Sequence, residues 1–309
     1  MYCGSITDIA GVICGHQSNT RALTGCSAVL FGAKGAVCGV DVRGAAPGTR
    51  ETDLLRPGNL IERAHAIVLS GGSAFGLDAA GGAMRYLEEQ GIGFPTADAI
   101  VPIVPAAVIY DLSVGDARVH PDAAMGYEAC RAATAAPPAQ GRVGAGCGAT
   151  VGKMLGAKAA MAGGIGMASI TALGATVAAI VAVNAFGDVL DYRTGRILAG
   201  ARLPNGSFPG VQNLLTGAVP IPDLAGQNTT IGVVATDALL DKAQANRLAA
   251  VAHDGLAWAV RPAHTQLDGD TLFAASCGER TVDFHMLCAM AAEVVARAIA
   301  NAVECANHD

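Results

Sequence analysis

The sequence predicts an α/β fold made of closely packed layers. Two segments each place an apolar strand before a helix. Residues 66–70 lead through a glycine turn to a helical segment at 77–91, and residues 229–236 lead to a helix at 237–253. Glycine alone accounts for 40 of the 309 residues, and alanine is still more frequent. Side chains this small let backbones approach closely, so we expect tight layers with glycine-rich turns.

The remaining elements follow from strand patterns and turn residues. The first half is expected to contain strands at 26–31 and 36–42 joined by a turn at 32–35, an apolar stretch at 100–110 broken by two prolines, and a loop at 134–144. The second half is expected to contain an irregular stretch at 203–228, a stop for the helix at Gly255, and a long helix at 282–305.

One uncharged segment, residues 159–187, is long enough to span a bilayer. It is rich in glycine and alanine, which contribute little to membrane insertion. We therefore expect a buried strand-turn-helix unit there, and no second candidate for a membrane span. The amino-terminal residues 1–11 lack the basic and apolar regions of a signal peptide.

Charge and cysteine content exclude several classes of function. The formal net charge is -6, and no basic patch suited to a phosphate backbone is visible, which argues against nucleic acid as a partner. The nine cysteines are scattered and never form a Cys-x-x-Cys pair, so neither a structural zinc site nor a disulfide scaffold is expected. Small buried cysteines are typical of a reducing compartment, and the expected location is cytoplasmic.

The glycine-rich segment 143–154 does not fit a phosphate-binding loop. A Walker A motif would need glycine at Cys147 and serine or threonine at Met154. The looser match to a dinucleotide-binding motif has no preceding apolar strand and no acidic residue at the right distance. The metalloprotease pattern His-Glu-x-x-His and the hydrolase pattern Gly-x-Ser-x-Gly are also absent.

The boundary between the irregular stretch and the strand at 229–236 suits a self-processing nucleophile. The hydroxyl of Thr229 could attack the carbonyl of Asn228 and shift the acyl group from nitrogen to oxygen. Water would then release a new chain that begins with Thr229. The freed α-amine, with an intrinsic pKa of roughly 7.7–8, can then act as the base for its own hydroxyl. An Asn-Thr pair before a strand is also compatible with a simple turn.

Two carboxylates lie about forty residues further on, at Asp268 and Asp270, separated by one glycine. Residues i and i+2 of a strand share a face, and a glycine also permits a sharp turn, so both carboxylates can converge on one point. Close carboxylates repel, which raises one pKa unless a cation lies between them. The alternatives are an Asx turn and, with only two acidic residues, a less favoured calcium loop.

These residues belong to a set of motifs that resembles the DmpA-type aminopeptidase family, and within it most closely the endo-type 6-aminohexanoate-oligomer (nylon-oligomer) hydrolases. The resemblance runs nearly end to end, and the Asn-Thr-Thr strand start with Asp-Gly-Asp is its most specific part. The motifs lie at 7–16, 69–82, 144–153, 182–191, 228–240 and 264–276.

The resemblance implies a four-layer αββα sandwich like that of N-terminal-nucleophile hydrolases. It implies a single catalytic domain over 1–309 that cuts itself between Asn228 and Thr229 into associated fragments of residues 1–228 and 229–309. The site residues that match the family are Thr229 as nucleophile, Asp268 and Asp270 as the acidic pair that orients it, Lys153 as the active-site lysine, Asn184 as oxyanion donor and Tyr110 as a pocket residue.

These implied roles fit the chemistry of amide hydrolysis. The tetrahedral intermediate carries a negative oxygen that needs a preorganised donor, such as the amide of Asn184. A lysine near the nucleophile would lower the pKa of the amine and add positive potential. No catalytic role is expected for His16, His65 or His264, because a structural hydrogen-bonding histidine is more common.

The expected function is a self-processing hydrolase of linear amides such as 6-aminohexanoate oligomers, with an aminopeptidase releasing N-terminal residues, including D- or β-amino acids, as the alternative. The aminopeptidase branch typically cuts before serine and has serine in its acidic pair, whereas this chain has threonine and two aspartates. No cofactor or metal is implied. The expected assembly is a tetramer of processed protomers. An acyl transferase and a non-catalytic binding protein of the same fold are the remaining alternatives.

Overall fold

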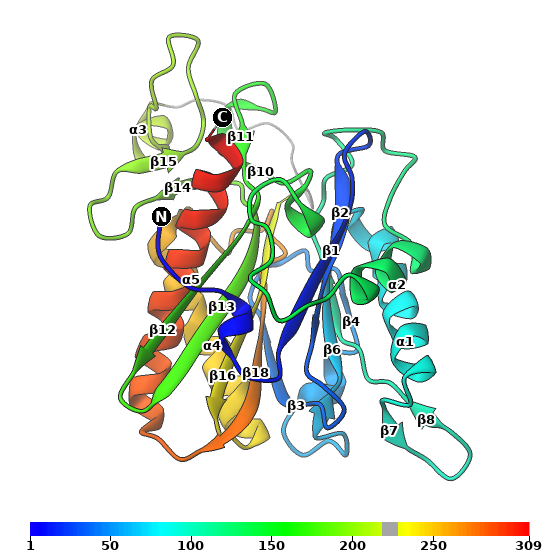
Figure 1. Ribbon diagram of the computed structural model, residues 1–309. Helices are drawn as coiled ribbons and strands as arrows, with labels where there is room; N and C mark the ends of the chain where they lie inside the picture. The colour runs from blue at the N-terminus through cyan, green and yellow to red at the C-terminus, as the bar shows by residue number, and fades with distance from the viewer. Residues whose placement is uncertain (218–227, 309) are drawn as a thin grey trace.

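Two β-sheets face each other and carry helices on their outer sides in the computed structural model, which describes residues 1–217 and 228–308 (Figure 1). The six-stranded sheet has the order β12 (Ile165–Ala172), β13 (Ala175–Asn184), β16 (Thr229–Ala238), β18 (Thr271–Arg280), β3 (Ala36–Val42), β5 (Arg63–Ala64). The five-stranded sheet has the order β1 (Ile13–Asn19), β2 (Thr24–Leu30), β6 (Ala66–Ser70), β9 (Ala106–Val108), β4 (Thr49–Arg50). Neighbouring strands are antiparallel except in the pairs β16–β18 and β6–β9.

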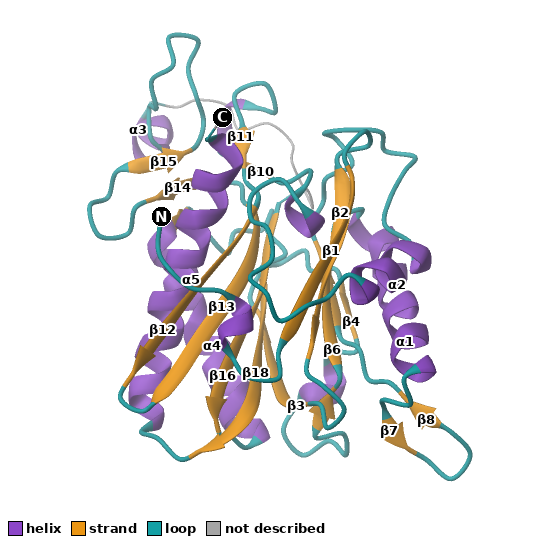
Figure 2. Cartoon of the chain, viewed as in Figure 1, coloured by secondary structure: helices purple, strands orange, loops and turns teal. Residues whose placement is uncertain are grey.

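Helices complete the four layers, as Figure 2 shows. The long helices α4 (Lys242–Ala259) and α5 (Phe284–Asn307) cover the six-stranded sheet, and α1 (Ala79–Glu89) and α2 (Ala123–Arg131) cover the five-stranded sheet. The smaller elements are α3 (Val211–Thr216), the sheet of β14 (Asp188–Leu190), β15 (Ile197–Ala199) and β17 (Val260–Arg261), and the pairs β10 (Thr150–Val151) with β11 (Met161–Ala162) and β7 (Phe94–Pro95) with β8 (Ile100–Val101). The expected four-layer αββα sandwich is confirmed.

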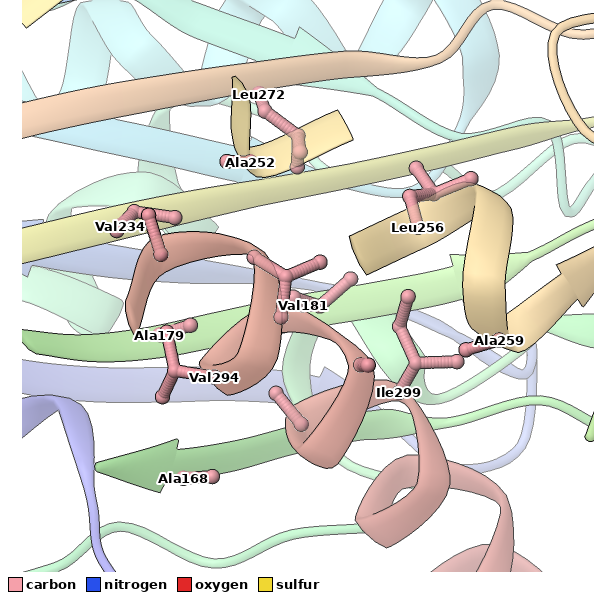
Figure 3. Packing of buried hydrophobic residues seen from close by; sticks show 14 of the residues in the cluster. Ala168, Ala179, Val181, Val234, Ala252, Leu256, Ala259, Leu272, Val294 and Ile299 are labelled. Atoms are coloured by element: carbon pink, nitrogen blue, oxygen red, sulfur yellow. The ribbon is translucent and has the colours of Figure 1, made fainter. Parts of the chain in front are cut away.

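Burial on both faces explains the apolar sequence of the central strands. Along β13, Val177 and Val181 pack towards α4 and α5, whereas Ala178 and Ile180 pack between the two sheets. Figure 3 shows Val181 among side chains of α5, including Val294 and Ile299. A strand that is buried on both faces is apolar at nearly every position instead of alternating.

The segment 159–187 is therefore a strand hairpin, and the expected strand-turn-helix unit is wrong. Strands β12 and β13 pair along their whole length through a two-residue turn at Leu173 and Gly174, whose φ angles of 54° and 83° suit a tight antiparallel hairpin. An apolar run without alternation does not distinguish a doubly buried strand from a buried helix, which is why the pattern was misleading.

The sequence was expected to hold only one candidate for a membrane span, but helix α5 is a second apolar segment of sufficient length. By length and composition it could cross a membrane, but 72% of its most apolar window is buried in the protein. It packs against α4, β12 and β13, which is the environment of a core helix. Its amino terminus is capped by Asp283, whose carboxylate accepts a hydrogen bond from the backbone of His285.

Other expected boundaries shift for identifiable reasons. The turn at 32–35 joins strands of two different sheets, β2 and β3. Helix α4 starts later than expected, at Lys242, because β16 continues to Ala238 and Asp241 forms the capping box. It passes through Gly255, whose missing side chain lets α4 contact the carbonyl of Ala292 on α5. The irregular stretch at 203–228 includes α3, and its residues 218–227 lie outside the described residues.

Candidate active site

Strand pairing brings the expected site residues together at one end of the six-stranded sheet. Asn184 is the last residue of β13 and lies opposite Thr229, the first residue of β16. The parallel pairing of β16 with β18 continues before the first residues of both strands, where Asn228 forms a bridge with Asp268. Lys153 reaches the same place from a short 3-10 helix, Lys153–Leu155. Four segments distant in sequence thus meet around the Asn228–Thr229 bond.

Two groups donate hydrogen bonds to the carbonyl oxygen of Asn228. The hydroxyl of Thr229 donates a short hydrogen bond to it, and the backbone N–H of Gly269 donates a second at 2.9 Å. Asn228 and Thr229 are buried, so water competes little for this oxygen. Gly269 has to be glycine, because a Cβ there would lie 2.8 Å from the Thr229 hydroxyl and 2.5 Å from the carbonyl of Ala46. The glycine between the two aspartates therefore makes room for the hydroxyl.

The two carboxylates have different partners. Asp268 accepts hydrogen bonds from the backbone N–H and the hydroxyl of Thr265, at 2.9 and 2.6 Å. Burial, and secondly the charge of Asp270, raise the pKa of the Asp268 carboxyl. Asp270 accepts the backbone N–H of Thr230 at 2.7 Å through one oxygen and His264 through the other. Asp270 is thus tied directly to the start of β16.

Lys153 and Asn184 form a buried polar pair. The Lys153 ammonium donates to the side-chain oxygen of Asn184 at 2.8 Å and to its backbone carbonyl at 3.2 Å. The Asn184 amide nitrogen donates to the backbone carbonyl of Tyr110 at 3.0 Å. Burial lowers the pKa of Lys153 to about 7, although the charges of Asp268 and Asp111 oppose that shift. The lysine can therefore be charged or neutral near neutral pH.

The structure also places two residues at the site that the sequence did not single out for a role there. His264 bonds to Asp270, and its only signal in the sequence was its position six residues earlier. Asp111 is buried, accepts hydrogen bonds from Thr24 and Gly72, and acts electrostatically on Lys153. Tyr110 contributes its backbone carbonyl to the site. His16 and His65 bond elsewhere, to Ser27 and to the backbone of Ile103 respectively.

A surface cavity of about 690 Å³ has Leu155, two residues after Lys153 in sequence, in its lining, which contains none of the expected site residues. Two cationic side chains, Lys158 and Arg202, line it. Within residues 1–217 and 228–308, no group of three His, Cys, Asp or Glu side chains is arranged to hold a metal ion.

The fold is that of the N-terminal-nucleophile hydrolases. The buried hydroxyl of Thr229 and the buried carboxylates of Asp268 and Asp270 lie at the starts of two central strands, and the buried amine of Lys153 reaches the same place. A solved L-aminopeptidase D-Ala-esterase/amidase from Ochrobactrum anthropi, described as a variant of the Ntn hydrolase fold, matches 98% of this chain and 86% of its own with a TM-score of 0.73 at 20% identity. A Burkholderia sp. beta-aminopeptidase matches 96% of this chain and 85% of its own with a TM-score of 0.71 at 25% identity.

Sequence comparison assigns the family. The model of peptidase family S58 matches residues 4–308, and the chain belongs to this family of peptide and amide hydrolases. An uncharacterized aminopeptidase of Mycobacterium leprae is 46% identical over 89% of this chain and 78% of its own length. A 6-aminohexanoate-oligomer endohydrolase of Agromyces sp. is 33% identical over 88% of this chain and 74% of its own. The aminopeptidase is the more similar of these two relatives, and the resemblance to the nylon-oligomer hydrolases is more distant.

Proposed function

We propose that the chain cuts itself between Asn228 and Thr229 and then hydrolyses amides with Thr229 as an N-terminal nucleophile. The observation that carries this proposal is the geometry at the bond itself. The Thr229 hydroxyl and the Gly269 N–H both donate a hydrogen bond to the Asn228 carbonyl oxygen. An N–H aimed at a carbonyl oxygen stabilises the negative charge that this oxygen gains on attack.

The self-cleavage would proceed by two substitutions at one carbonyl carbon. The Thr229 oxygen attacks that carbon, its proton passes through a nearby base to the Thr229 nitrogen, and the peptide C–N bond breaks to leave an ester. Water then hydrolyses the ester and releases the Asn228 carboxylic acid and the Thr229 hydroxyl. We propose Asp268 as the base, because its backbone bridges Asn228 beside the cleaved bond and because burial raises the pKa of its carboxyl.

Substrate hydrolysis would reuse the same residues. The new α-amine of Thr229 takes the proton of its own hydroxyl as the hydroxyl attacks the substrate amide. The acyl group is transferred to Thr229, the substrate amine leaves with a proton, and water frees the acid. Asn184 would exchange its bond to Tyr110 for one to the substrate oxyanion, while Lys153 holds the Asn184 side chain in place.

Self-cleavage predicts two fragments in the purified protein. Denaturing electrophoresis and intact-mass measurement should show residues 1–228 and 229–309, with Thr229 at the new amino terminus. The two fragments should co-purify under native conditions, because β16 and β18 of the small fragment are central strands of a sheet that the large fragment completes. Fully active protein that consists of a single uncut chain would contradict the proposal.

The substrates that we propose are linear amides such as 6-aminohexanoate oligomers. The Agromyces relative with this activity in its name, the threonine and the aspartate pair support this class. The M. leprae relative supports an aminopeptidase instead, because it is named as one and is more similar. Both candidates hydrolyse an amide bond, but only an aminopeptidase needs the free amine of its substrate.

An amino-capped substrate separates these two candidates. We expect an N-acetylated 6-aminohexanoate oligomer to be cleaved at a rate within about tenfold of the free oligomer, because one lost terminal contact is worth about 1.4 kcal/mol or less. The products would be measured by mass spectrometry. Loss of cleavage on capping, together with release of single residues from uncapped peptides, would assign the aminopeptidase activity.

A further inference from the structure

His264 is an ionisable group that the proposed mechanism leaves unused although it contacts the site directly. Its ring Nδ1 lies 2.8 Å from Asp270 Oδ2, and its own backbone N–H donates to the same oxygen at 3.1 Å. The other oxygen, Oδ1, is left to the backbone N–H of Thr230. The carboxylate therefore cannot rotate without losing hydrogen bonds on both sides.

The backbone of His264 adopts a conformation that its side chain disfavours. Its φ angle is +56°, in the left-handed region where glycine and, less often, asparagine are found. This conformation lets the ring and the backbone N–H of one residue reach the same carboxylate oxygen. Strained residues of this kind cluster at functional sites, where the surroundings hold them in place.

The groups around the His264 ring leave Nδ1 as the nitrogen that makes its polar contact. On α4, the ring of His253 stands edge-on at 4.9 Å, and its Nε2 donates to the backbone carbonyl of Asp41 on β3. Burial lowers the pKa of His253 to about 4, so this neighbour is uncharged at neutral pH. The Asp41 carboxylate is paired with Arg43. His264 Nε2 is buried without a hydrogen-bond partner in the described part of the chain, so the hydrogen bond of the ring to Asp270 runs through Nδ1 alone.

We propose that His264 is a positioning residue that fixes the orientation of the Asp270 carboxylate, so that its Oδ1 stays on the Thr230 N–H at the start of β16. This inference rests on the proposed function, because it assumes that Thr229 and Asp270 act in the reaction. In physical terms, the ring and the backbone N–H of His264 hold one oxygen of the carboxylate while the Thr230 N–H holds the other. Loss of the imidazole should therefore loosen the carboxylate and lower kcat more than it changes KM.

Two substitutions separate this role from a structural one. His264→Gly removes the ring but suits the positive φ angle, so the backbone conformation should persist although a buried hydrogen bond is lost. His264→Asn also tolerates this backbone conformation and offers an amide N–H near the position of Nδ1. The probe is the separate measurement of kcat and KM of the processed enzyme on a 6-aminohexanoate oligomer or an aminoacyl anilide, whichever the wild type cleaves, with thermal unfolding measured alongside.

We expect His264→Gly to lower kcat about tenfold and to keep KM within about twofold of the wild type, because the change affects the alignment of the carboxylate beside the nucleophile. His264→Asn should keep kcat within about threefold of the wild type, because it keeps a donor to the carboxylate. A wild-type kcat in His264→Gly, or an equal loss of kcat in both variants, would overturn the inference. Failure of the wild-type chain to be cut before Thr229 would instead overturn the proposed function.

Discussion

Thr229→Ala should leave the chain uncut and reduce amide hydrolysis to the background rate. The substitution removes the hydroxyl that donates to the Asn228 carbonyl oxygen, and it also prevents release of the α-amine that would serve as base. Removing a catalytic nucleophile typically lowers the rate by at least about 10⁴-fold. The fold should persist, because alanine fits the buried start of β16 and the backbone pairing with Asn184 is unchanged.

Intact mass and turnover of the same preparation check this result. Thr229→Ser is the matched control, since it keeps a hydroxyl and should keep both cleavage and activity within about a hundredfold of the wild type. An uncut Thr229→Ala chain that still turns over substrate would place the nucleophile elsewhere. The first residue to test would then be Thr230, whose buried hydroxyl has no hydrogen-bond partner in the described part of the chain.

The local parts of the site could be predicted from the sequence. Asn228 and Thr229 stand at the change from an irregular stretch to a β-branched strand, and Asp268 and Asp270 lie within one short motif. In each case the signal is contained in a few consecutive residues. The structure brings the two motifs together because the strands that follow them, β16 and β18, are parallel neighbours.

The non-local parts of the site depend on register, which the sequence alone does not specify. Asn184 faces Thr229 only because β13 pairs with β16 in one particular register, and a shift by one residue would move its side chain to the other face. A site role for Lys153 could be assigned only from the family resemblance, because its contact with Asn184 is also non-local. His264 was not expected, because its contact with Asp270 depends on a left-handed backbone conformation that glycine, not histidine, normally signals.

The fold errors have one common cause. The hairpin at 159–187 was expected to contain a helix, and Gly255 was expected to end one. In both places small apolar residues serve close packing between layers: β13 is buried on both faces, and Gly255 contacts the backbone of Ala292. In a chain so rich in alanine and glycine, these residues signal close approach as often as they signal a turn.

Lys153→Met should abolish efficient hydrolysis and remove the rise of stability with pH that the wild type should show between about pH 7 and 10.5. Without the ammonium, the Asn184 side chain loses the donor that orients its oxygen, so the amide no longer points reliably at an oxyanion. Loss of one oxyanion donor typically lowers the rate by about 10²–10³-fold. Asp268 also loses a nearby positive charge, which raises the pKa of its carboxyl group further.

The effect of Lys153 on stability has a definite sign. Its pKa is lowered from 10.5 to about 7 by burial, so between these pH values the unfolded chain holds a proton that the folded chain has released. The free energy of unfolding should therefore rise with pH across this window in the wild type, and the contribution should be lost as pH falls through about 7. In Lys153→Met this rise should be absent. Denaturant unfolding at several pH values between 7 and 10.5 measures it.

Lys242→Met provides the matched control for Lys153→Met. Lys242 is also buried and also donates to backbone carbonyls, those of Asn59 and Ile61, but it lies at the amino terminus of α4 outside the site. Its replacement should lower stability by about 1–3 kcal/mol, because two carbonyls lose their donor, while self-cleavage and turnover continue. If Lys242→Met lost activity as completely as Lys153→Met, the effect at Lys153 would come from general damage to the core and not from its place beside Asn184.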